Sequence, residues 1–149
     1  MKKSIALLLL TFFSVAAHAD IGQQAKVIGD WTIYKKVDIM TDKTQCIALF
    51  GGNKNIQLNE AGLAFGKLGY PQAYKYRLDD EPLSQLVLNE DVPKQMGAVI
   101  LEGTLFERIK GSKRFRIQVT ATPLQTFDLN TSAANTVLAE FKKQGCTGS

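Results

Sequence analysis

Histidine is nearly absent from this chain of 149 residues, which contains only His18. Serine–histidine–aspartate triads, cysteine–histidine pairs, histidine-containing zinc sites and histidine general bases all depend on that side chain. His18 lies in an N-terminal segment that we expect to be removed, as argued below. The remaining chain would then contain no histidine, and these classes of catalytic and metal site are excluded.

Cysteine is also scarce, since Cys46 and Cys146 are the only two and no C-x-x-C motif is present. In an oxidising compartment an even pair indicates one disulfide. Closing a loop of about 100 residues contributes about 4.7 kcal/mol in the chain-entropy description. Two free thiols or a redox pair are the alternatives, and the expected compartment favours the disulfide.

Motifs that mark common enzymes are missing as well. The chain has no G-x-S-x-G, S-x-x-K, P-loop or G-x-G-x-x-G pattern, so nucleophilic serine chemistry and nucleotide binding lack their usual sequence signals. We expect no cofactor and no metal. An enzymatic role is not favoured, although chemistry based on carboxylates stays open.

The first nineteen residues have the three parts of a secretory signal. Lys2 and Lys3 precede an apolar run from residue 5 to 15, and Ala17-His18-Ala19 places small residues at the cleavage positions. The run is shorter than the roughly 20 apolar residues that cross a bilayer, so no transmembrane anchor is expected. We predict cleavage after Ala19 and a periplasmic or secreted protein. Residues 20–149 would form a single globular domain.

Removing Lys2 and Lys3 leaves 16 basic and 14 acidic residues, a net charge of +2. Such a small excess gives no reason to expect a nucleic-acid partner. The remaining 130 residues are enough for one domain with a substantial hydrophobic core.

Alternating apolar and polar residues predict several short strands. In the first, Trp31, Ile33 and Val37 share one face, and Tyr34 lies on the other. Asp38 to Lys43 is expected to be a polar loop, and residues 90–93 another loop. The other predicted strands cover residues 45–50, 56–58, 73–79, 83–88 and 114–120, with an irregular strand within 61–70.

Two segments suggest helices. An apolar spacing of four residues favours a helix over Met96–Lys110, although Gly97 and Gly103 also permit a hairpin. A final helix should begin at a cap among residues 130–132, run to Gln144 and end at Gly145. We therefore expect an α+β fold, a mainly antiparallel twisted sheet or sandwich with one or two helices. The disulfide would join the last helix to the strand that contains Cys46.

Exposed strand positions supply the candidate binding residues. The alternation directs five of them outward, in a pattern that could bind an acidic partner; a solvated strand face is the alternative. These residues are Tyr34, Lys75, Arg77, Arg114 and Arg116. The acidic group Asp79-Asp80-Glu81 could serve glycoside hydrolysis, but its position before Pro82 favours a solvated turn.

Four sequence features together resemble those of a known class of proteins. They are Gly29-Asp30-Trp31 at a strand start, Thr41-Asp42 before Cys46, the Y-x-x-D-x-x-P element Tyr76 to Pro82, and Phe127-Asp128-Leu129 before the last helix. The chain is similar in these features to small periplasmic accessory proteins of type VI secretion, of the TagO/VasI type. It resembles the invasion-associated locus B family more distantly, since that family usually has more cysteines.

The resemblance implies a shared fold and a location in the cell envelope, and it supplies no catalytic residues. We therefore expect an exported, non-enzymatic binding or accessory protein with a protein partner in the envelope. The alternatives are an inhibitor of a periplasmic or foreign hydrolase, in which a loop such as residues 51–55 enters a cleft, a virulence or host-interaction factor, and a cell-wall glycan enzyme that uses carboxylates.

Overall fold

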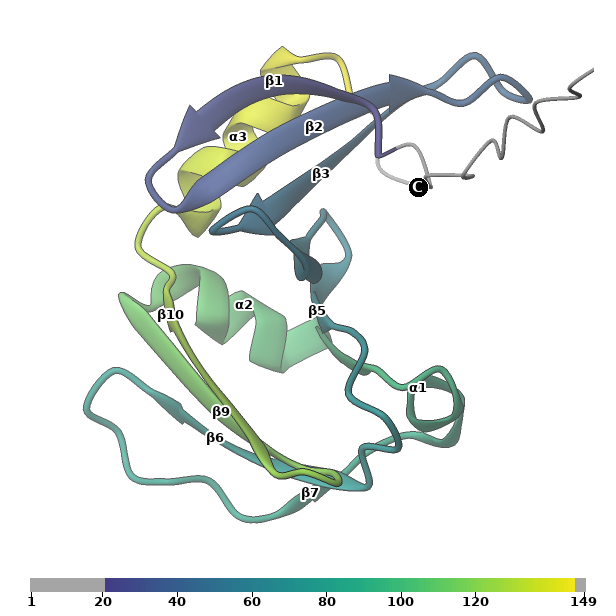
Figure 1. The fold of residues 1–149 in the computed structure, drawn as a ribbon. Helices are drawn as coiled ribbons and strands as arrows, with labels where there is room; N and C mark the ends of the chain where they lie inside the picture. Colours follow the sequence, from purple (N-terminus) through teal and green to yellow (C-terminus); the bar gives the residue numbers. More distant parts are fainter. Residues whose placement is uncertain (1–20, 147–149) are drawn as a thin grey trace, which may run out of the picture.

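The structure is a computed structural model that describes residues 21–146 (Figure 1). The predicted signal segment and its cleavage site after Ala19 lie outside these residues. Among the described residues the elements follow one another as β1 (Gln23–Ile28), β2 (Trp31–Val37), β3 (Thr44–Phe50), β4 (Asn53–Leu58), β5 (Gly62–Phe65), β6 (Ala73–Leu78), β7 (Val87–Leu88), α1 (Asp91–Gln95), β8 (Val99–Glu102), α2 (Gly103–Gly111), β9 (Arg114–Thr120), β10 (Gln125–Asn130) and α3 (Ala134–Lys143).

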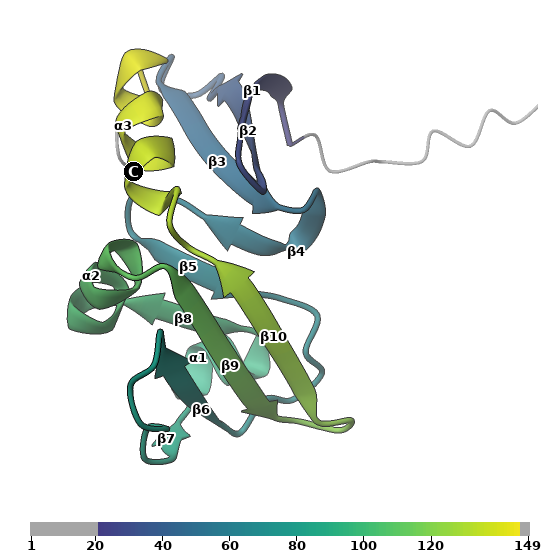
Figure 2. The ribbon, with the colours of Figure 1, turned by 90° about the vertical axis from the view of Figure 1, so that its left-hand side faces the viewer.

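The strands form two antiparallel sheets, which confirms the predicted α+β class. The larger sheet has the order β1-β2-β3-β4-β5-β8, and the smaller sheet has the order β10-β9-β6-β7. Figure 2 shows α3 beside the β1–β3 end of the larger sheet and α2 beside β5 and β8 at its other end. Along the chain, α3 follows the strands of both sheets.

One hydrophobic core joins the two sheets. Phe65 on β5 contacts Phe115 on β9 and Phe127 on β10, with ring centroids 6.4 and 4.9 Å apart. Phe65 and Phe115 are completely buried, and burial of each such side chain stabilises the fold by about 1.5–3 kcal/mol. The inward positions of β6 and β9 belong to this core, so their alternate residues face outward.

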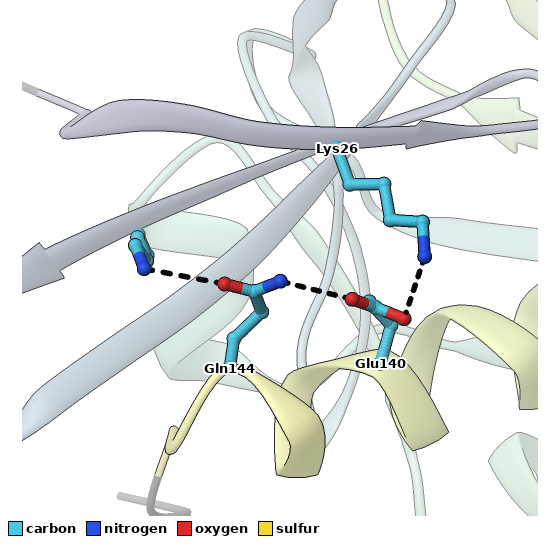
Figure 3. A network of polar contacts seen from close by, with 4 residues as sticks. Lys26, Glu140 and Gln144 are labelled. Carbon is cyan, nitrogen blue, oxygen red and sulfur yellow. Dashed lines mark hydrogen bonds and ion pairs between the residues drawn. The ribbon is translucent and has the colours of Figure 1, made fainter.

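The last helix is fastened to the larger sheet by a disulfide and by polar contacts. Cys46 on β3 is bonded to Cys146, three residues after the end of α3. Glu140 accepts a hydrogen bond from Lys26 at 3.0 Å and another from Gln144 at 2.9 Å (Figure 3). Gln144 in turn accepts one from Lys35 at 3.2 Å. The predicted link between the last helix and the strand of Cys46 is confirmed.

The helix predicted over Met96–Lys110 is only partly correct. Residues Val99–Glu102 form β8, which pairs with β5, and the helix α2 begins at Gly103. Gly103 has φ of +61°, which interrupts regular backbone and lets the chain turn from strand to helix. The four-residue apolar spacing misled the prediction because Val99 and Leu101 are also buried at a strand spacing of two.

Other local predictions were also wrong. Only Val87–Leu88 of segment 83–88 is a strand. Val37 is 57% exposed because it lies at the end of β2 beyond the core. Residues 91–95 form the short helix α1, not a loop. The predicted cap among residues 130–132 is also incorrect, since α3 begins after Ala133 without a side-chain cap.

Candidate functional site

Four of the five predicted binding residues come together on two neighbouring strands of the smaller sheet. Lys75 and Arg77 lie on β6, and Arg114 and Arg116 lie on β9. Arg77 is directly opposite Arg116 in the antiparallel pair. Their positions alternate with the buried residues of the same strands, which places these side chains on the face away from the core. We call Lys75, Arg77, Arg114 and Arg116 the basic strip.

Tyr34 does not belong to this group. It lies on β2 of the larger sheet, opposite Gln24 on β1 and Ile47 on β3, and its side chain is half-buried. The five residues predicted as one set therefore occupy two different sheets.

Arg77 and Arg116 are held by the backbone of the turn that follows β6. The Arg77 Nε donates to the carbonyl oxygen of Glu81 at 2.6 Å, and its Nη2 reaches that of Asp80 at 3.5 Å. The Arg116 Nη2 donates to the carbonyl oxygen of Asp79. Carbonyl groups orient a guanidinium but leave its full charge in place. The turn therefore aims two positive charges without neutralising them.

The acidic turn, residues 79–81, follows β6 directly and is hydrogen-bonded to the start of β9. Asp79 has φ of +46°, and its Oδ1 accepts backbone N–H bonds from Lys113 at 2.9 Å and Arg114 at 2.8 Å. Glu81 forms an ion pair with Arg108 of α2. Two of the three acidic side chains thus have structural contacts, which favours the interpretation of this segment as a turn.

Arg114 is the member of the basic strip whose charge is paired. It donates to Asp128 on β10 through Nε at 2.9 Å and Nη2 at 2.5 Å. These hydrogen bonds raise the pKa of Arg114 and lower that of Asp128. Asp128 is also opposite Arg116 on the neighbouring strand. Because Arg114 occupies both carboxylate oxygens of Asp128, the unneutralised charge of the strip is concentrated at Lys75, Arg77 and Arg116.

The Arg116 Nε is buried and has no hydrogen-bond partner among the described residues. A buried N–H without an acceptor costs free energy. A guanidinium donates through several N–H groups and can bind a carboxylate through two of them. The buried Nε cannot reach a ligand, but the side chains of Arg77 and Arg116 are both partly exposed, and guanidinium groups are suited to recognising a carboxylate or another oxyanion.

A second feature is a hollow of about 420 Å³ between α2 and α3. It is lined by two lysines, one carboxylate, one amide and two apolar side chains. Its lining residues are Glu60, Lys110, Asn135, Leu138, Ala139 and Lys142. Lys110 is already paired with Glu107 at 2.7 Å, so the hollow offers less unpaired charge than the basic strip.

Residues 21–146 contain no group of three or more His, Cys, Asp or Glu side chains that could hold a metal ion. Within the same part of the chain, no helix has the length and apolar character needed to cross a membrane. Comparison with protein-family models, with curated proteins and with solved structures gave no significant match.

Sequence reasoning found the strip but missed how it is organised. The register that brings Asp128 beside Arg114 and Arg116 depends on the pairing of β9 with β10, and the segment around Phe127 was not predicted to be a strand. The exposed pair Ile39 and Met40, in the loop expected to be polar, was also missed. Two adjacent large apolar residues at a hairpin tip are the signal that could have revealed it.

Proposed function

We propose that this protein is an exported, non-enzymatic binding protein that uses the basic strip to hold an acidic segment of a protein partner in the cell envelope. The observation that carries the proposal is the opposed pair Arg77 and Arg116. Both guanidiniums are oriented by carbonyl groups of the turn at residues 79–81, and no described carboxylate is hydrogen-bonded to either.

The energetics of the sheet support a binding role for this pair. Like charges directly opposite each other in an antiparallel sheet are destabilising. Asp128 reduces that repulsion, but Arg114 already occupies its carboxylate. An acidic partner would relieve the remaining repulsion between the two guanidinium groups.

The link to secretion machinery rests on the resemblance to periplasmic accessory proteins of type VI secretion. Two of the quoted motifs meet at the proposed site, because Tyr76 to Pro82 covers the end of β6 and the turn at residues 79–81, and Asp128 of Phe127-Asp128-Leu129 pairs with Arg114. An accessory role in an envelope or secretion machine is the specific form of function that we infer from this combination.

A capture experiment tests the proposal. Tagged residues 20–149 would be cross-linked in envelope extract of the native cells, and captured proteins would be quantified by mass spectrometry. We expect one dominant envelope component. Its yield should fall at least about tenfold in the Arg77→Ala/Arg116→Ala variant, because each charge-assisted contact contributes about 1.5–3 kcal/mol.

Lys54→Ala/Lys143→Ala is the matched control, since it removes two positive charges from exposed positions elsewhere. Its capture should equal that of the unchanged protein. Arg77→Lys/Arg116→Lys keeps the charge but loses the fork-shaped donor, and we expect intermediate capture. Equal capture by all four proteins, with each one folded by circular dichroism, would refute the role of the basic strip.

A further inference from the structure

The end of β10 and its connection to α3 contain the one N-x-S/T sequence of the chain, Asn130-Thr131-Ser132. In exported proteins this pattern marks asparagines that accept N-linked glycans. The bacterial form of the motif adds an acidic residue two positions before the asparagine, and Asp128 supplies it. Residues 128–132 therefore match the longer and more selective pattern D/E-x-N-x-S/T.

The Asn130 side chain lies where the folded domain can carry a glycan. Asn130 is exposed, whereas its neighbours Leu129 and Thr131 are buried. The Asn130 Oδ1 accepts hydrogen bonds from the backbone N–H of Ser132 at 3.1 Å and from its Oγ at 2.6 Å. The Asn130 Nδ2, the atom that would carry the sugar, donates to no other described residue. A glycan on Nδ2 would extend into solvent without displacing a contact of the fold.

Other parts of the motif are held inside the folded domain. The backbone N–H of Thr131 donates to the Lys113 carbonyl at 3.0 Å, and its Oγ1 donates to the Ser112 carbonyl at 3.0 Å. Both carboxylate oxygens of Asp128 accept hydrogen bonds from Arg114. An enzyme that reads the acidic residue and binds the backbone beside Asn130 cannot do so while these contacts exist. Modification would therefore have to precede folding.

We propose that Asn130 is an acceptor site for an N-linked glycan, modified after export and before β9, β10 and α3 pack around the motif. The substrate class is an oligosaccharide linked to a polyprenyl pyrophosphate, and the reaction requires a transferase in the envelope membrane. The proposal rests on export, which is part of the proposed function, but it does not depend on the basic strip.

The transfer makes one bond and breaks another. The Asn130 Nδ2 forms a bond to the anomeric carbon of the first sugar, and the bond from that carbon to the pyrophosphate oxygen breaks. The lipid pyrophosphate leaves with the electron pair of the broken bond, and Nδ2 releases one proton. The product is a glycosylated amide that no longer has the second N–H of the asparagine side chain.

Mass spectrometry of the protein produced from its full gene and purified from the native cells tests the proposal. The N-terminal sequence first establishes whether the signal segment has been removed. We expect an intact mass that exceeds that of the processed chain by one oligosaccharide, attached to the peptide that contains Asn130. Asn130→Gln and Ser132→Ala should each abolish the added mass. Ser132→Thr should keep it, because threonine also supplies the required hydroxyl.

Asn59→Gln is the matched control. Asn59 is also exposed, and its Oδ1 accepts backbone N–H bonds from Ala61 and Gly62, both at 2.9 Å, but residue 61 has no hydroxyl. The added mass should remain in this variant. Folded protein made without residues 1–19 should gain no mass when it is incubated with native envelope membranes, and a gain would contradict modification before folding.

Two results would overturn the acceptor site itself. One is a processed chain whose mass equals that of its sequence with one disulfide, and the other is an added mass that persists in Asn130→Gln. A chain that still begins at Met1 would contradict export, and the acceptor site would fail with it. Loss of capture in the Arg77→Ala/Arg116→Ala variant is independent of all these outcomes, so the two proposals can fail separately.

Discussion

Glu140 shows how one side chain can fasten the last helix. It is 7% exposed although it is ionisable, and it accepts hydrogen bonds from Lys26 on β1 and from Gln144 at the end of α3. These bonds, from Gln144 first and Lys26 second, hold the pKa of Glu140 below its ordinary value of 4.5. A carboxylate in this position connects the first strand to the last helix.

The lowered pKa of Glu140 predicts a pH-dependent stability. The folded state favours the ionised form, so the contribution is complete above pH 4.5 and is lost as the pH falls through the lower folded-state pKa. Replacing Glu140 by Gln should reduce stability at pH 7 and flatten its decline below pH 4.5. Thermal unfolding from pH 7 to pH 3 measures both effects.

Glu60→Gln is a suitable control for that experiment, because Glu60 is exposed and lies in the β4–β5 connection. It should unfold at acid pH as the unchanged protein does. An equally steep acid decline in the Glu140→Gln variant would show that other carboxylates cause the acid sensitivity.

At the scale of elements, two positions near the junction of β5, β8 and α2 require glycine for different reasons. Gly103 has φ of +61° and open space where a Cβ would lie, whereas a Cβ on Gly62 would come within 2.6 Å of the Leu101 carbonyl oxygen. One position requires a conformation that most residues avoid, and the other requires close approach of two backbones.

These demands predict different responses to alanine. Gly103→Ala should cost about 1–2 kcal/mol from backbone strain alone, and Gly103→Asn should cost less because Asn tolerates this conformation. Gly62→Ala should cost more than either, since β8 must shift away from β5. Urea unfolding gives the free energies, and an equal cost for the two alanine variants would contradict this account.

The spacing of apolar residues predicted an element correctly where it fitted either a strand or a helix, but not both. Residues 114–120 alternate strictly, and β9 occupies exactly that range. Residues 96–110 satisfy both a strand and a helix spacing, so pairing with β5 decided where β8 ends and α2 begins. The register that opposes Arg77 to Arg116 likewise comes from strand pairing, which no local pattern contains.

At the scale of the whole molecule, the disulfide closes a long loop that runs from β3 to the segment after α3 and leaves β1 and β2 outside it. Cys46 and Cys146 are separated by 100 residues, and a covalent link of that length restricts the unfolded chain strongly. The bond starts from β3, the third strand of the larger sheet, and α3 is held there in addition by the contacts of Glu140 and Gln144.

Removing this bond should lower the free energy of unfolding substantially. We expect a loss of about 2–5 kcal/mol for Cys46→Ser/Cys146→Ser, measured by urea unfolding against the oxidised protein. The reduced unchanged protein should match the variant. Intact mass with alkylation before and after reduction checks the bond itself, and two thiols that alkylate without reduction would refute it.

The sequence by itself determined the α+β class, the cysteine pair and the outward direction of Lys75, Arg77, Arg114 and Arg116. These properties follow from composition and from the two-residue period of a strand, which are local. Tertiary structure alone decided the split of the strands into two sheets, the separation of Tyr34 from the basic strip and the anchoring of Arg77 and Arg116 by the turn. Each of these depends on pairing between distant segments, which is fixed by the packing of the whole core.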